Sequence, residues 1–234
     1  MVKYPISRLG EFLFCEYKVY LKYVKKKPSE VTQKMKDGTK AHNELARKIK
    51  KKKEETKQKT KEYKKQVKKI KSDKKLKPKE KKEQIKKIPK PPKDNIWREF
   101  KVIGQRLKGR IDELKIEKER ILITDDKASD RAFDSDKMQV YGYCLAYSEE
   151  HPDMLENHII EARLRNHQTG VIQWSEIFTD AHKQKVLEVV DRLEGVMNGT
   201  IEPVPTTSST KCRYCNLKKQ CDKKVEDYGL DDLY

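Results

Sequence analysis

The net charge of this chain is concentrated in one segment. Residues 47–93 contain 24 basic and 6 acidic residues and therefore carry +18, which is also the formal net charge of all 234 residues. The rest of the chain has 32 basic and 32 acidic residues and is neutral. The charged fraction of the whole chain, 40%, therefore represents neither the basic segment nor the rest of the chain. The distribution predicts a neutral globular body with one basic insertion.

The length suits one domain of generous size. We predict a single domain over residues 1–234, with a Lys-rich insertion at 51–93 and a C-terminal cysteine-bearing segment at 203–223. No segment approaches the ~20 apolar residues that a membrane span needs, and residues 1–10 lack the apolar core of a signal peptide. We therefore expect an intracellular, cytoplasmic protein that does not contact membranes. In that compartment the five cysteines are more often metal ligands or free thiols than disulfides.

Apolar periodicity predicts helices around a sheet. Residues 6–24, which include Cys15, and residues 37–50 show helical spacing. The basic segment continues as a solvated helix and then as a linker with one short helix at 79–88, broken at Lys77-Pro78. Two-residue alternation then predicts a meander of three strands. The remaining expected elements, in order, are strands 97–105, 107–116 and 120–127, helix 134–147, hairpin strands 157–166 and 171–178, and helix 180–197.

Two motifs on the predicted strands bring acidic and basic side chains together. Gly109-Arg-Ile-Asp112 lies in the second strand, and Asp125-Asp126-Lys127 ends the third. Antiparallel neighbours can place Asp112 beside Asp125, and Lys127 shares the face of Asp125 because it is two residues away. Carboxylates suit Mg²⁺ or Mn²⁺, which polarises a phosphoryl group and activates water, while a lysine can hold or help deprotonate that water. The pattern predicts phosphodiester hydrolysis.

Three further side chains extend this candidate site. Gln139 and Tyr143 are four residues apart and share one helical face, where they could position a phosphate or the attacking water. His42 is a candidate third metal ligand, and imidazole would favour Mn²⁺. Each has an ordinary alternative, because Tyr143 could be a core tyrosine, a lone histidine is more often a packing or surface residue, and an Asp-x-Lys strand end is commonly solvated.

Four cysteines form a second candidate site. Cys212, Cys215 and Cys221 are clustered near the C-terminus, and Cys15 lies nearly two hundred residues earlier. Four thiolates suit Zn²⁺ or an iron–sulfur cluster about equally, and either would join the first helix to the C-terminal tail. Unliganded reduced thiols are the alternative. We place Cys144, the fifth cysteine, in the core of the helix after the strands.

These features occur in an order that resembles one family of enzymes. A distal cysteine, a histidine helix, G-x-x-D, D-x-K, Q-x-x-x-Y and a cysteine triplet resemble the RecB-like PD-(D/E)XK nucleases with an iron–sulfur staple. The chain looks most like the fourth family of CRISPR-associated (Cas) proteins, since AddB-type helicase–nucleases share the staple but are far longer. The resemblance runs from Cys15 to Cys221, apart from the basic insertion.

The resemblance implies a restriction-endonuclease-like α/β fold, with a small mixed sheet flanked by helices and with the N-terminal helix and C-terminal tail joined by the cluster. It also implies a metal-dependent DNA exonuclease acting mainly on single strands, with a role in trimming CRISPR spacers beside integrase proteins. The implied metal ligands for Mn²⁺ or Mg²⁺ are His42, Asp112 and Asp125; the implied catalytic residues are Asp112, Asp125, Lys127, Gln139 and Tyr143; and the implied ligands of a [4Fe–4S] cluster are Cys15, Cys212, Cys215 and Cys221.

Two features depart from the family, and one competing function stays open. The family often has Glu where Asp125 stands, and the Lys-rich insertion is not one of its features. The insertion could gather nucleic acid through phosphate contacts or could serve only solubility. The competing function is a non-catalytic DNA-binding or adaptor module with a structural metal cluster, although the set from His42 to Tyr143 is complete, as a nuclease requires.

Overall fold

The computed structural model, described over residues 2–30, 33–73, 76–88 and 95–226, contains two units. The sheet unit comprises Met1–Gly38 and Ile96–Tyr234, and the helical unit comprises Thr39–Asn95. Between residues 33 and 53 the described side chains are those of Glu44, Arg47 and Lys51.

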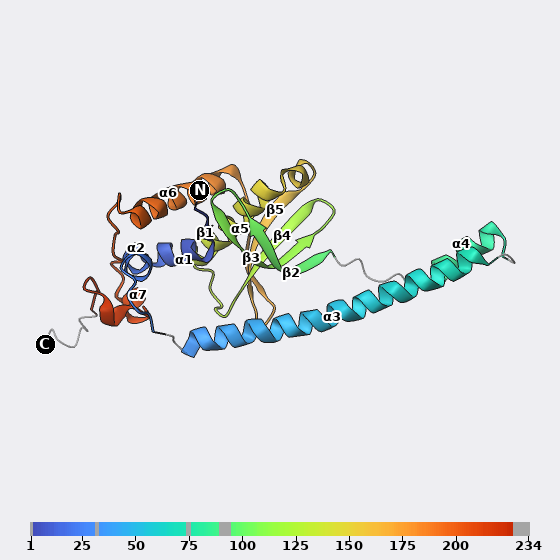
Figure 1. Ribbon diagram of the computed structural model, residues 1–234, viewed down its shortest axis with the longest axis horizontal. Helices are drawn as coiled ribbons and strands as arrows, with labels where there is room; N and C mark the ends of the chain where they lie inside the picture. Colours follow the sequence, from blue (N-terminus) through green and yellow to red (C-terminus); the bar gives the residue numbers. More distant parts are fainter. Residues whose placement is uncertain (1, 31–32, 74–75, 89–94, 227–234) are drawn as a thin grey trace. The chain divides into compact units, whose positions relative to one another are not determined.

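A mixed sheet of six strands lies at the centre of the sheet unit (Figure 1). β2 (Ile96–Ile103), β3 (Leu107–Ile116) and β4 (Arg120–Lys127) form the antiparallel meander that side-chain alternation predicts. β5 (Ile159–Asn166) pairs with β4 in parallel, and β6 (Ile172–Ile177) returns antiparallel to β5. A parallel pair needs a crossover connection, and here α5 lies in that connection.

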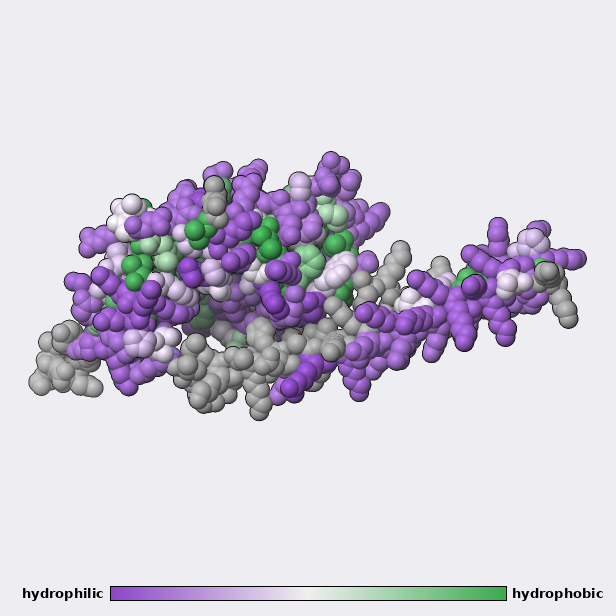
Figure 2. Space-filling view, in the orientation of Figure 1, coloured by the Kyte–Doolittle hydropathy of each residue, from purple (hydrophilic) through white to green (hydrophobic). Residues whose placement is uncertain are grey.

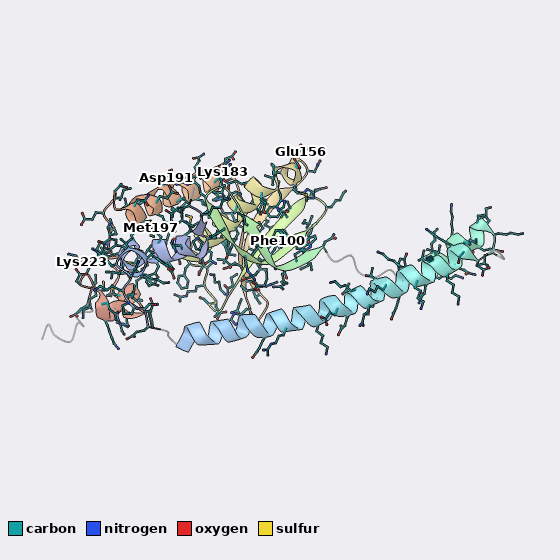
Figure 3. All side chains as sticks on the ribbon, in the orientation of Figure 1. Phe100, Glu156, Lys183, Asp191, Met197 and Lys223 are labelled. Carbon is teal, nitrogen blue, oxygen red and sulfur yellow. The ribbon has the colours of Figure 1, made fainter. Side chains whose placement is uncertain are left out.

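α5 (Asp134–Glu150) is the most buried helix of the sheet unit. Its residues from Val140 to Tyr147 are all buried, because the sheet contacts it on one side and α1 (Ser7–Phe14) and α6 (Asp180–Asn198) on the other. A helix that is apolar around its whole circumference belongs in a core. Phe100, labelled in Figure 3, packs from β2 against the ring of Tyr147 with centroids 6.2 Å apart. Cys144 is fully buried in this core, as predicted.

The two edges of β3 have different neighbours. β2 pairs along one edge, whereas the other edge is shared by β1 (Tyr4–Pro5), which pairs in parallel with Leu107 and Lys108, and β4, which pairs from Glu113 onward. Residues 109–112 of β3 have no registered strand partner on the shared edge. This gap in the pairing leaves space beside Asp112, and β1, being two residues long, was not predicted from the sequence.

The first predicted helix is broken at Cys15, which corrects the expectation of one helix over residues 6–24. α1 ends at Phe14, Cys15 is extended (φ −168°, ψ 118°), and α2 (Glu16–Val19) leads into a π-helical turn at Tyr20–Val24. Apolar residues keep helical spacing on both sides of the break, so periodicity could not reveal it. The break places Cys15 at a junction between elements instead of within a helix.

The C-terminal segment is fastened to these N-terminal elements by polar contacts. Arg192 of α6 binds the Glu16 carboxylate through two hydrogen bonds, from Nε at 2.6 Å and Nη2 at 2.8 Å. The backbone N–H of Val204 donates to the same carboxylate, and Tyr17 Oη donates to Asp222 at 2.6 Å. Two parallel hydrogen bonds to one carboxylate fix orientation as well as distance. Polar contacts from α6, from the Val204 backbone and to the Asp222 side chain therefore join the C-terminal part of the chain to α2.

The helical unit contains most of α3 (Gln33–Ser72) and all of α4 (Pro78–Lys87). α3 is a single helix of 40 residues, so the predicted helix at 37–50 and the first half of the basic segment are continuous. α4 matches the predicted short helix and begins with its proline at the first turn, where proline is tolerated. Figure 2 shows mostly hydrophilic side chains along the described parts of both helices. Within the described residues, no helix joins sufficient length to the apolar composition that crossing a bilayer demands.

Candidate active site

Asp112 and Asp125 come together where β3 and β4 separate. The last registered pair of these strands is Glu113↔Thr124, and the next step of the same register sets Asp112 opposite Asp125. Asp112 Oδ2 accepts a hydrogen bond of 2.7 Å from the backbone N–H of Asp126. Its side chain thus takes the place that a backbone carbonyl would fill in a continuing ladder.

Asp125 is only 3% exposed and pairs with two other side chains of the site. Its Oδ1 accepts a hydrogen bond from Gln139 Nε2 at 3.3 Å. Its Oδ2 lies 2.9 Å from Lys127 Nζ, with which it forms an ion pair. A buried charge is costly unless it is paired, so Lys127 partly offsets the cost of burying this carboxylate.

Lys127, Gln139 and Tyr143 form one connected network beside the carboxylates. Lys127 Nζ donates to Gln139 Oε1 at 3.1 Å, and Gln139 Nε2 lies 3.1 Å from Tyr143 Oη, to which it donates. The predicted sharing of one helical face by Gln139 and Tyr143 is thus realised at the strand ends. Because the Tyr143 oxygen accepts from Gln139, its own hydroxyl proton is available for another acceptor.

Gly109 explains why the tyrosine can approach the sheet. A Cβ atom at this position would lie 2.8 Å from Tyr143 Cε1 and 3.1 Å from Ile6 Cδ1, closer than side chains pack. The glycine of the G-x-x-D motif therefore provides room for the Tyr143 ring against β3, three residues before Asp112. The need for glycine here arises from the packing of α5 on the sheet, and the residues next to Gly109 in the sequence do not reveal it.

Asp126 anchors the end of β4 from the opposite face of the sheet. Arg165 of β5 binds it through Nε (2.7 Å) and Nη2 (2.9 Å), and Arg98 of β2 adds a hydrogen bond of 3.1 Å. Both arginines also pair with Glu113. Successive side chains of a strand point to opposite faces, so this network fixes β4 while leaving Asp125 and Lys127 on the α5 side.

Asp136 is a site residue that sequence reasoning missed. Its Oδ1 lies 3.2 Å from Lys127 Nζ, so Lys127 has two carboxylate partners. Asp136 precedes Gln139 by three residues on α5 and therefore shares its face. That spacing was the available signal, although acidic residues are common in the first turn of a helix for their interaction with its dipole.

Burial and charge set the protonation of these groups. Burial, followed by repulsion from Asp125, raises the pKa of Asp112 to about 8, and burial likewise raises the pKa of Asp125 against the opposing attraction of Lys127. Burial alone would lower the pKa of Lys127, but Asp125 and Asp136 outweigh it and raise that pKa. Lys127 is thus held as a cation, suited to stabilising negative charge and unsuited to taking up a proton.

The donor set fits a hard divalent cation. Two adjacent carboxylates whose ionised forms are disfavoured by burial would both be stabilised in those forms by added positive charge. Oxygen ligands are those that Mg²⁺ and Mn²⁺ prefer. Among the described residues, no three His, Cys, Asp or Glu side chains converge as a complete metal site. Mg²⁺ in particular usually keeps several waters when carboxylates bind it.

Sequence comparison decides the family. Residues 5–222 match the PD-(D/E)XK nuclease superfamily. The chain belongs to that superfamily. The match includes Asp112, Asp125 and Lys127, and the mixed sheet flanked by helices agrees with the α/β fold expected for a PD-(D/E)XK nuclease.

Solved structures similar to this PD-(D/E)XK nuclease are distant in sequence. One, from Eubacterium rectale and described as a "putative exonuclease", has a TM-score of 0.48 at 15% identity over 99% of this chain and 92% of that chain. The protein SSO0001 has a TM-score of 0.35 at 18% identity over 57% of this chain and 63% of that chain. A comparison with curated protein sequences gave no match.

His42, the predicted third metal ligand, belongs to the helical unit. Its backbone belongs to α3, but its side chain lies outside the described residues, and Thr39–Asn95 form the separate helical unit. The assignment of His42 as a metal ligand therefore stays a prediction. The described site of this nuclease is built from β3, β4 and α5 alone.

The four cysteines assigned to a cluster line one pocket of the nuclease. Cys15, Cys212, Cys215 and Cys221 all border it, together with five lysines, one of which is Lys223, labelled in Figure 3. None of the four forms a disulfide. The distant Cys15 and the C-terminal triplet are thus brought together, as the sequence predicts, although no three of the described thiols converge with the geometry of a closed metal site.

Backbone N–H groups point at the sulfur atoms of this pocket. The N–H of Val225 donates to Cys212 Sγ at 3.4 Å. Burial raises the pKa of the Cys215 and Cys221 thiols, and hydrogen bonds from the backbone of Leu217 and Lys223, respectively, oppose that rise. Hydrogen bonds to sulfur favour the thiolate, which is the form that binds metal.

The raised pKa of Asp112 predicts that cation binding depends on pH. A proton and a cation compete for the same carboxylate, so affinity for Mn²⁺ is expected to rise by up to about tenfold per pH unit until the pH passes the Asp112 pKa of about 8. Calorimetric titrations on both sides of that pH measure it. An affinity that does not change with pH would contradict the prediction. Asp112→Asn is expected to reduce the slope and to remove most of the affinity, because the pKa of Asp125 is raised as well.

The same pKa fixes the sign of a stability effect in the metal-free protein. The unfolded chain releases the Asp112 proton near the ordinary value of 3.8, whereas the folded protein keeps it up to about 8. The folded state therefore binds more protons across this window, and its contribution to stability falls as pH rises through it. Asp112→Asn is expected to remove that fall, which thermal unfolding at several pH values would show.

Proposed function

We propose that this PD-(D/E)XK nuclease hydrolyses phosphodiester bonds of DNA with a divalent cation, Mg²⁺ or Mn²⁺, held by Asp112 and Asp125. The observation that carries the proposal is the pair of adjacent carboxylates, Asp112 and Asp125, whose ionised forms are disfavoured by burial and which lie beside a lysine held as a cation. A cation at this position would favour the ionised forms of both aspartates. When bound, it would polarise the phosphoryl group and lower the pKa of water.

The protein groups around the carboxylates would then bind and orient the substrate. Lys127, charged and only 23% exposed, would stabilise negative charge on the phosphate. Tyr143 keeps its proton because burial and then Asp125 raise its pKa, so its hydroxyl would donate to a phosphate oxygen. Gln139 forms hydrogen bonds with Lys127, Tyr143 and Asp125, and would fix the positions of these three side chains relative to one another.

We also propose that Cys15, Cys212, Cys215 and Cys221 hold an iron–sulfur cluster, of the [4Fe–4S] type in keeping with the family resemblance. Three observations support it: the four thiols line one pocket, backbone N–H groups donate to three of the sulfurs, and five lysines border the pocket. Four thiolates around such a cluster carry net negative charge, which nearby lysines would balance. The donor set fits a cluster chemically, and its role would be structural.

Exonuclease action on single-stranded ends is proposed from the resemblance to RecB-like nucleases. Membership in the fourth family of Cas proteins, work on CRISPR spacers and contact with integrase proteins stay predictions, because other cysteine-stapled nucleases share the same motifs. The basic α3 and α4 offer a sequence-independent surface for phosphates and would suit binding of DNA outside the site.

A cleavage assay tests the proposed function. Single-stranded, duplex and circular DNA, labelled at one end, are incubated with Mg²⁺, with Mn²⁺ or with a chelator. We expect release of short products from linear single strands with either ion, no cleavage with the chelator, and intact circles. Cleavage of circular DNA would show that the protein acts as an endonuclease. Binding of DNA without cleavage in the presence of either ion would favour a non-catalytic adaptor.

A further inference from the structure

A short connection, residues 128–133, joins the end of β4 to the start of α5. It follows Lys127 directly and ends three residues before Asp136, whose carboxylate lies 3.2 Å from Lys127 Nζ. Both ends of the connection are therefore fixed at residues of the candidate active site. The side chains that the connection exposes lie at the edge of that site.

The turn between β5 and β6 holds this connection in place. Asn166, which is 2% exposed, donates from Nδ2 to Asp130 Oδ1 at 2.7 Å. Gln173 Nε2 donates to the backbone carbonyl oxygen of Ser129. Within the connection, the backbone N–H of Arg131 donates to Ser129 Oγ at 3.0 Å. A segment that is already fixed before binding loses less conformational entropy when a ligand binds to it.

Phe133 is the last residue of the connection and the N-cap residue of α5. N-cap positions favour Ser, Thr, Asp and Asn, whose side-chain oxygen accepts a hydrogen bond from the first turn, and phenylalanine has no such atom. Its carbonyl oxygen accepts from the N–H of Asp136 at 2.9 Å, and its side chain is 51% exposed. Exposed apolar residues are common on proteins. A phenylalanine that neither caps its helix nor fills the core, directly beside the site, is not explained by the fold.

Arg131 adds a positive charge to the same connection. It is exposed, and within the described residues its guanidinium group forms no hydrogen bond or ion pair. The neighbouring acidic side chains have other partners, because Asp130 binds Asn166 and Asp134 lies 3.4 Å from Lys137 Nζ. A guanidinium group binds phosphate through two parallel hydrogen bonds. The fixed connection therefore offers an aromatic ring and a phosphate-binding group two residues apart.

We propose that residues 128–133 bind a nucleotide of single-stranded DNA next to the scissile phosphate, with its base stacked on Phe133 and a phosphate bound by Arg131. The inference rests on the proposed nuclease function and deepens it by assigning residues that select single strands. Proteins that bind single strands combine positive charge with aromatic rings on which unpaired bases stack. Because every base has a face that can stack, the site would accept any sequence.

Substitutions in the connection separate stacking from charge. Phe133→Ala is expected to weaken binding of single-stranded DNA about tenfold, as loss of one stacked base does, and to leave duplex binding unchanged. Phe133→Tyr keeps a ring and is expected to bind like the wild type. Arg131→Gln is expected to lower the slope of log affinity against log salt concentration by about 0.7. Both positions are exposed, so all three melting temperatures should stay close to that of the wild type.

Fluorescence of 2-aminopurine reports base stacking separately from cleavage. The full chain is titrated with short oligothymidine that carries 2-aminopurine at successive positions, in a chelator that keeps the DNA intact. We expect the wild type and Phe133→Tyr to quench the fluorescence, and Phe133→Ala to lose the quenching. Leu155→Ala, in an exposed turn at the other end of α5, is the matched control and should behave as the wild type.

The outcomes distinguish the stacking site from the nuclease activity. Loss of single-strand affinity and quenching in Phe133→Ala, with both retained in Phe133→Tyr, supports the inference. Wild-type affinity and quenching in Phe133→Ala overturn it and leave the proposed nuclease standing, and so does an equal loss of affinity for single strands and duplex. Quenching by a wild-type protein that cleaves no DNA with Mg²⁺ or Mn²⁺ contradicts the proposed nuclease activity and leaves the stacking site standing.

Discussion

Replacing Asp125 with asparagine is expected to reduce DNA cleavage by about a thousandfold or more. A metal ion supplies several kcal/mol of charge stabilisation in such reactions, and each 1.4 kcal/mol corresponds to about a factor of ten in rate. The neutral amide keeps the shape of the carboxylate but loses the ion, and it also deprives Lys127 of its partner at 2.9 Å. Single-turnover cleavage of end-labelled single-stranded DNA measures the effect.

The controls for Asp125→Asn follow from its surroundings. Folding is expected to persist, because Asp125 is a buried carboxylate whose ionised form is disfavoured, so circular dichroism and melting temperature should match or exceed those of the wild type. Asp153→Asn in an exposed turn after α5 serves as the matched substitution and should leave cleavage unchanged. Cleavage by Asp125→Asn at the wild-type rate would show that the reaction does not use this carboxylate.

Replacing Cys215 with serine is expected to prevent binding of the proposed iron–sulfur cluster and to destabilise the sheet unit. Wild-type protein purified without oxygen should be brown, absorb broadly near ~400 nm and hold about four irons per chain, and the variant should lose both colour and iron. Removing a bound metal group takes away stabilisation that only the folded state receives. With about 2–4 °C of melting temperature per kcal/mol for a chain of this size, we expect a decrease of roughly ten degrees.

Cys144→Ala is the matched control for the cysteine prediction, because Cys144 is buried in α5 and does not border the pocket. It should retain the colour and iron of the wild type. A colourless wild-type protein that holds one Zn²⁺ would support a structural metal site and contradict the iron–sulfur cluster. A wild-type protein without bound metal would contradict both the cluster and a zinc site. The contacts of Glu16 with Arg192 and Val204 would then be what holds the C-terminal segment.

Loss of the proposed cluster is also expected to affect the active site through α1. Gly10 of α1 packs so closely on α5 that a Cβ atom there would lie 2.9 Å from the Ser135 carbonyl oxygen and 3.6 Å from Gln139 Oε1. The same helix ends at Phe14, directly before Cys15. Within α1, the residue that packs beside Gln139, Gly10, is therefore only five positions before Cys15 of the cysteine pocket. Cys215→Ser is expected to slow cleavage as well, with a smaller effect than Asp125→Asn.

Local patterns in the sequence were sufficient to predict the strands and the helix that carry the site residues. Side-chain alternation predicted β2, β3 and β4 to within two residues, and the spacings within D-x-K and Q-x-x-x-Y placed Lys127 and Gln139 on the faces where the structure has them. These properties depend on the periods of a strand and a helix, which neighbouring residues set by themselves. The order of motifs was also sufficient to indicate the superfamily.

Tertiary structure alone decided how the site is completed. The shared edge of β3, the break at Cys15, the approach of Asp136 to Lys127 and the positive φ of Glu99 all depend on contacts between residues distant in the chain. The pKa of Asp112 depends on burial and on Asp125, which belongs to another strand. Such properties follow from packing and from the low dielectric of the interior, so the sequence determined which residues are available and the fold determined what charge they carry.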